Sequence, residues 1–154
     1  ALMVGLSDDK TGPGGDPAAK VSAKVSAVID MYGVVNFSKH GKGIVPGVSA
    51  AEQAAYLPEN QCDPQDPAVL ILHGTADTTV DIAQSDAMAK ALRAAKVSHE
   101  YVVVDGAPHT FDLHPKGKGW KRSGVIGGVD VNSASDQPDV TKVTLEFLAR
   151  TIGK

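Results

Sequence analysis

The sequence predicts an α/β fold in which parallel strands are flanked by helices on both faces. Three short runs are apolar at nearly every position, at residues 25–29, 68–72 and 100–104. Continuous apolar runs of this length are typical of strands buried on both faces, whereas half-exposed strands alternate. A helical pattern separates the second run from the third, and another closes the chain. Strand, excursion, strand, helix, strand, loop and helix in this order indicate a parallel sheet.

The segments before the second strand are less regular. The opening "ALMVGLSDDK" has no capping residue and no basic leader ahead of its apolar letters. We interpret it as the back end of a helix and expect the chain to be a fragment or a processed half. Residues 7–17 are rich in Gly, Pro and Asp and predict a loop. Residues 36–67 contain scattered Gly and Pro and one weak helical segment, "SAAEQAAYL", and predict an irregular, lid-like excursion.

The two helices on either side of the third strand have amphipathic patterns. Asp81 predicts an N-cap, with Gln84 as its capping-box partner. The apolar face of this first helix consists of Ile82, Met88, Ala89, Leu92 and Ala95. The last helix begins near "SDQPD", and its apolar stripe consists of Val140, Val143, Phe147, Leu148 and Ile152. Three parallel strands leave an unpaired edge, so we expect further strands from an absent front half.

Composition narrows the classes of partner. The 154 residues fit one domain, and 15 basic against 18 acidic residues give a net charge of −3. This balance argues against a nucleic-acid or anionic-membrane partner, and no apolar stretch approaches the roughly 20 residues that span a bilayer. The single cysteine, Cys62, lies in a polar stretch and is interpreted as a passive loop thiol.

Polar side chains that could perform chemistry follow the second and third strands. Asp77 stands five residues beyond Leu72, and His109 stands five beyond Val104. Catalytic groups of α/β sheets gather at the carboxyl ends of strands, and a carboxylate that orients an imidazole is what nucleophilic catalysis requires. From local pattern alone each residue has an ordinary alternative, because aspartates form turns after strands and loop histidines are usually solvated.

The segments "LILHGTADTTV" and "EYVVVDGAPHTFDL", with the helix between them, resemble the C-terminal half of α/β-hydrolase esterases. The similarity is to the branch with acetyl-xylan esterase-like, feruloyl esterase-like and dienelactone hydrolase-related enzymes. The HGxxDxxV segment of that family carries the acid of the catalytic triad, which matches Asp77. The GxxHxF segment carries the triad histidine, which matches His109. The resemblance therefore implies an α/β-hydrolase domain and a carboxylic-ester hydrolase.

The nucleophile is absent from the sequence, since none of its 154 residues belongs to a G-x-S-x-G motif. The resemblance implies that the serine and both oxyanion donors lie upstream of Ala1, in an N-terminal half on the same or a separate polypeptide. We therefore expect this chain alone to be inactive, to need that half as its partner, and to act on a small ester without a cofactor. A prolyl-oligopeptidase-type peptidase half and a non-catalytic, hydrolase-like binding protein remain the alternatives.

Several other residues are candidates for the site. Asp30 is the runner-up acid, since some α/β-hydrolases take the acid from this earlier strand; its alternative is a structural aspartate. His73 is expected to pack or to bond to backbone. A metal site at His109, Asp112 and His114 lacks supporting Cys or HExxH signals, so no metal is predicted. Trp120 either borders the pocket and stacks on a sugar ring or is a half-buried loop residue.

Overall fold

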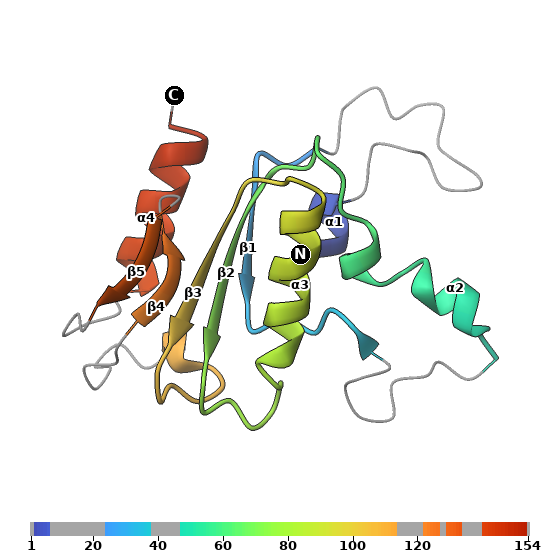
Figure 1. Ribbon diagram of the computed structural model, residues 1–154, viewed down its shortest axis with the longest axis horizontal. Coiled ribbons are helices and arrows are strands. Elements are labelled where there is room, and N and C mark those ends of the chain that lie inside the picture. The colour runs from blue at the N-terminus through green and yellow to red at the C-terminus, as the bar shows by residue number, and fades with distance from the viewer. Residues whose placement is uncertain are drawn as a thin grey trace.

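The computed structural model describes six stretches of the chain, residues 2–6, 24–37, 47–113, 122–126, 129–133 and 140–153. They form a five-stranded sheet in the order β1-β2-β3-β4-β5 (Figure 1). The three predicted strands are Ala27–Met31 (β1), Ala68–Gly74 (β2) and His99–Val104 (β3), and they pair in parallel. The predicted α/β class is therefore confirmed.

Helices cover both faces of the sheet, which explains the continuous apolar runs. The short helix α1 (Leu2–Leu6) and α3 (Ala83–Ala94) lie against one face, and α4 (Val140–Thr151) lies against the other (Figure 1). Because successive strand residues point to opposite faces, Val69 and Ile71 pack in the cluster under α3. Leu70 and Leu72 pack in the cluster under α4. The four side chains from Val69 to Leu72 are all buried in this way.

An antiparallel hairpin extends the sheet beyond β3, where the sequence analysis assigned only a loop. It consists of β4 (Arg122–Ile126) and β5 (Val129–Ser133). These strands lack an apolar run, so their pattern does not stand out. Gly124 is required at its position, since an added Cβ would lie 2.0 Å from the Tyr101 carbonyl oxygen. The sheet is therefore mixed, not purely parallel.

The predicted capping box at the start of α3 is wrong. Asp81 accepts a hydrogen bond from the Ala83 amide at 2.8 Å, but the Gln84 side chain does not reach back to it. Instead the buried side-chain oxygen of Gln84, Oε1, accepts hydrogen bonds from the Val35 and Asn36 amides at 3.0 and 2.8 Å. Backbone donors buried without a partner are costly, so Gln84 is used to satisfy the segment after β1.

The excursion at 36–67 contains the predicted weak helix, α2 (Ala50–Ala54), and a 3-10 turn at Pro58–Asn60. A capping box does occur here, because Ser49 and Glu52 cap each other. Residues 38–46 lie outside the described stretches, and the lid-like role stays a prediction. No helix in the part of the chain that the structure describes is long and apolar enough to cross a membrane.

Candidate active site

Strands β2 and β3 end level with each other and place their following loops side by side. Gly74, the last residue of β2, is paired with Val104, the last of β3. Beyond this point the Thr75 amide donates to the Val104 carbonyl at 3.0 Å, and the Ala76 amide donates to the Ala107 carbonyl at 3.1 Å. The two loops therefore run together past the sheet edge, which brings their polar side chains into contact.

Asp77 and His109 meet at this edge. The His109 Nδ1 lies 2.7 Å from the Asp77 Oδ2, and the other carboxylate oxygen accepts the Thr79 and Val80 amides at 2.8 and 2.9 Å. The Asp77 side chain is fully buried, whereas 28% of the His109 side chain is exposed. Burial raises the pKa of Asp77, but the Val80 amide, the His109 side chain and the Thr79 amide outweigh it and lower the pKa below its ordinary value.

This pairing fixes the tautomer of His109. An ionised carboxylate only accepts hydrogen bonds, so the proton of the neutral imidazole is on Nδ1 and the lone pair is on Nε2. Asp77 is the one hydrogen-bond partner of His109 among the residues that the structure describes. Nε2 is thus available to take a proton from a nucleophile, which is the task of the base in a catalytic triad.

The two loops can approach this closely because residue 74 is glycine. A Cβ added there would lie 2.1 Å from the Ala107 carbonyl oxygen. We expect Gly74→Ala to destabilise the fold by about 1–3 kcal/mol through overpacking and to move Asp77 away from His109. Denaturant unfolding measures the first effect. Ala76→Ser, an exposed change in the same loop, should stay within about 0.5 kcal/mol, and equal stability of both variants would contradict the close-approach argument.

His73 supports Asp77 from within the core. Its ring is fully buried, with Nε2 2.9 Å from the Val80 carbonyl and Nδ1 2.6 Å from the Ser85 hydroxyl. A carbonyl only accepts, so Nε2 carries a hydrogen. The same nitrogen lies 3.4 Å from the Asp77 Oδ2. The expectation of a backbone-bonded histidine is confirmed, and the ring also holds Val80 through its carbonyl, while the Val80 amide donates to Asp77.

The structure does not bring Asp30 to His109. Asp30 is buried within β1, and the Gly33 amide bonds to its carboxylate. Burial raises the pKa of Asp30 to about 6, with the hydrogen bond from Gly33 acting in the opposite direction. Within the described chain Asp30 forms no ion pair or hydrogen bond with a histidine. The geometry therefore favours Asp77 as the acid.

The raised pKa of Asp30 gives a test by pH. Between about pH 4 and 6 the folded state holds a proton that the unfolded state has released, so stability falls as the pH rises through this window. A shift from 3.8 to about 6 corresponds to a cost on the order of 3 kcal/mol above pH 6. We expect Asp30→Asn to gain stability relative to the parent chain between pH 4 and pH 8 in denaturant titrations. Parallel pH profiles of parent and variant would contradict this, and the exposed Asp105→Asn is the control.

A model of the BD-FAE family matches residues 1–92, which is more than half of the chain. The chain belongs to the BD-FAE family. Residue 77 lies within the match and residue 109 beyond it. The resemblance to esterases of the α/β-hydrolase superfamily is thereby confirmed. No curated protein sequence matches the chain.

Several solved structures similar to this BD-FAE chain are hydrolases. An acetyl ester-xyloside bifunctional hydrolase from Caldicellulosiruptor lactoaceticus has a TM-score of 0.66 and 21% identity, over 99% of this chain and 52% of its own. A thermophilic esterase from the planctomycete Thermogutta terrifontis has 0.62 and 22%, over 97% and 50%. A puromycin-hydrolysing peptidase from Mycobacterium tuberculosis has 0.61 and 18%, over 88% and 19%. The chain spans about half the length of the two esterase-type relatives, as a partial hydrolase domain would.

The remaining candidates of this BD-FAE chain are less informative. Trp120 and His114 lie outside the described residues. Within the described stretches no group of three or more His, Cys, Asp or Glu side chains could hold a metal ion. Burial raises the pKa of the Cys62 thiol to about 11, so the thiol stays protonated at neutral pH and is a poor nucleophile.

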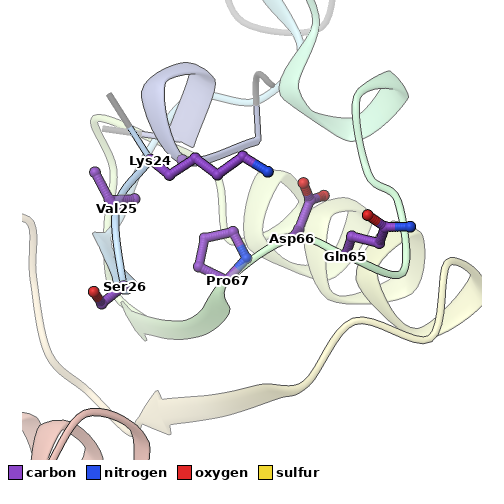
Figure 2. A pocket seen from close by; sticks show the side chains of 7 residues that line it. Lys24, Val25, Ser26, Gln65, Asp66 and Pro67 are labelled. Atoms are coloured by element: carbon purple, nitrogen blue, oxygen red, sulfur yellow. The ribbon is translucent and has the colours of Figure 1, made fainter. Parts of the chain in front are cut away.

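A cavity of about 150 Å³ opens where strands β1 and β2 begin. Residues 24–26, before β1, and 65–67, before β2, line it together with Gly5. Figure 2 shows the Lys24 side chain extended toward Asp66. These residues precede the strands, whereas Asp77 and His109 follow them. The cavity is therefore at the opposite end of the sheet from the candidate active site.

One further residue lies at the site without a sequence pattern that singles it out, namely Tyr32, which directly follows β1. Its ring centroid lies 4.4 Å from that of His109, and its hydroxyl donates to the Asp112 carboxylate at 2.6 Å. Burial, followed by the Asp112 hydrogen bond, raises the pKa of Tyr32 to about 12, so the hydroxyl keeps its proton. The position of this residue in the sequence was the available signal. Tyr32 follows the carboxyl end of β1, as Asp77 and His109 follow the carboxyl ends of β2 and β3.

Proposed function

We propose that this chain supplies the acid and the base of a serine carboxylic-ester hydrolase. The observation that carries the proposal is the 2.7 Å contact between the His109 Nδ1 and a fully buried Asp77 carboxylate. The nucleophilic serine belongs to a segment outside these 154 residues, since no G-x-S-x-G motif occurs among them. No cofactor takes part in this mechanism.

Each residue has one role in the reaction. The His109 Nε2 takes the proton of the serine hydroxyl as the serine oxygen attacks the ester carbonyl carbon. The same nitrogen then gives this proton to the leaving alkoxide, and an acyl-serine remains. In the second half His109 takes a proton from water as the water oxygen attacks the acyl carbon, then gives this proton to the departing serine oxygen, so the acid product leaves and the serine hydroxyl is restored. Asp77 holds the tautomer and stabilises the imidazolium formed in both halves.

The similar structures support esters as substrates. One relative acts on acetyl esters and xylosides by its name, and another is an esterase. Acetyl or similarly small acyl groups on carbohydrate are therefore the proposed substrates of the complete domain. The peptidase relative makes amide hydrolysis the alternative to be measured beside it.

The test compares p-nitrophenyl acetate with a p-nitroanilide. Both are offered to the chain alone and to the chain combined with the polypeptide segment that carries the G-x-S-x-G serine. Hydrolysis of the ester by the combination, inactivated by a serine-directed fluorophosphonate, supports the proposal. Anilide hydrolysis in its place would favour the peptidase, and no turnover of either would favour a binding protein.

A further inference from the structure

A single hydrogen bond does not aim the base. The Asp77 carboxylate fixes His109 at Nδ1, but the ring can still swing about the line that joins the two atoms. Only the direction of Nε2 matters to a nucleophile, and misplacement by about 1 Å can cost 10²-fold in rate. His109 is 28% exposed, so surrounding protein does not enclose the ring on every side. A second contact has to hold its plane.

Tyr32 makes that second contact. The ring centroids of Tyr32 and His109 are 4.4 Å apart, with the ring planes at 58°, a close, tilted contact at the short limit of the separations of about 4.5–7 Å in attractive aromatic pairs. The Tyr32 ring also meets Phe111 edge-on, with centroids 5.9 Å apart. Its hydroxyl donates to the Asp112 Oδ1 at 2.6 Å. Three of the four residues from 109 to 112 thus contact one side chain, and the turn that carries the base folds around Tyr32.

The backbone on both sides of this contact is strained. Tyr32 has a φ of 45° and Thr110 a φ of 60°, a left-handed conformation that non-glycine residues rarely adopt. Such strain persists only where surrounding contacts hold it, and it is concentrated at functional sites. The Tyr32 amide donates to the Leu72 carbonyl at 2.9 Å, which anchors the residue to β2. The Tyr32 backbone is therefore anchored to β2, and its side chain is held by the turn at residues 109–112.

We propose that Tyr32 is a positioning residue that fixes the ring plane of His109 and so aims Nε2. Its importance for rate rests on the proposed function, whereas its effect on the Asp77–His109 hydrogen bond does not. Strand β1, which carries the runner-up acid Asp30, thus contributes to the site through Tyr32 at its carboxyl end and not through Asp30.

A measurement on the chain itself tests the orientation. The proton between His109 and Asp77 should give a far-downfield proton NMR resonance that exchanges slowly with water. We expect Tyr32→Leu to speed this exchange by about tenfold or more, because the ring loses its lateral support, and Tyr32→Phe to preserve the resonance. Tyr101→Leu is the matched control, since the Tyr101 hydroxyl also bonds to a carboxylate, at 2.8 Å from Asp86, and its ring packs in the opposite cluster. Wild-type exchange in Tyr32→Leu would overturn the proposal.

A kinetic measurement on the chain combined with the serine-bearing segment tests the consequence. We expect Tyr32→Leu to lower kcat for p-nitrophenyl acetate by about 100-fold with little change in KM, and Tyr32→Phe to lower kcat by about fivefold at most, as the loss of one hydrogen bond would. Equal losses in Tyr32→Leu and Tyr101→Leu would mean general destabilisation and overturn the positioning role. Absence of turnover in the parent combination would refute the proposed function, while the NMR measurement would still decide on Tyr32.

Discussion

His109→Ala is expected, from the role proposed for it, to lower kcat for an activated ester by about 10⁶-fold in the combined, serine-bearing protein, as removal of the catalytic histidine does in a serine hydrolase. Among the described residues at the carboxyl ends of the strands, the His109 imidazole is the group that a buried carboxylate holds at one nitrogen and that has no hydrogen-bond partner at the other. Without it the serine proton has no acceptor, and the leaving alkoxide has no donor. Initial rates with p-nitrophenyl acetate at saturating ester measure the effect.

The matched control for this variant is His99→Ala. His99 is a half-buried histidine at the start of β3, whose Nδ1 lies 2.9 Å from the Val97 carbonyl, and it is at the far end of the strand from the site. Its replacement should leave kcat within a few-fold of the parent value. If the His109→Ala protein retained even 1% of the parent rate, its activity would be roughly 10⁴ times the expected residual activity. That result would exclude His109 as the base.

The parallel strands could be predicted because their burial is written in consecutive residues. Leu70, Ile71 and Leu72 are apolar in a row since helices lie on both sides, and such a run needs no long-range information. Its end was harder to place. Strand β2 continues through His73 to Gly74. The polar His73 can lie in the buried part of the strand because Ser85 and Val80 form hydrogen bonds with both ring nitrogens. Asp77 is thus only three residues past its strand, while His109 is five past β3.

What the sequence could not supply were contacts between distant segments. The spacing from Asp81 to Gln84 fits a capping box. The Gln84 side chain instead accepts hydrogen bonds from the amides of Val35 and Asn36, which lie 49 and 48 positions earlier in the chain. Tyr32 bonds to a carboxylate 80 residues away, and no local pattern carries that information. The hairpin after β3 had a local signal in Gly127-Gly128, a pair typical of tight hairpins, but its short strands contain no continuous apolar run like those of the three parallel strands.

Asp77→Asn is expected to lower kcat by about 10⁴-fold while the fold is retained. The position of the carboxylate explains why an isosteric change has so large an effect. One side-chain oxygen accepts two amides, from Thr79 and Val80, and only an oxygen can do so. The asparagine carbonyl must therefore occupy that side, and its NH₂ group must face His109. An NH₂ donor bonds to an unprotonated Nδ1, which moves the proton to Nε2 and leaves no lone pair for the serine.

The pH dependence of stability separates this tautomer argument from a simple loss of structure. Because the folded-state pKa of Asp77 is lowered, its contribution to stability is present above the unfolded pKa of about 3.9 and is lost as the pH falls through the folded value. Asp77→Asn should abolish this acid-dependent part and leave unfolding cooperative at neutral pH. Asp105→Asn, which alters an exposed carboxylate in the partner loop that accepts from Thr75 at 3.1 Å, should change neither kcat nor the acid limb by comparable amounts. If Asp77→Asn were active at the parent rate, with intact folding, the histidine would not depend on this carboxylate and the acid would have to be sought elsewhere.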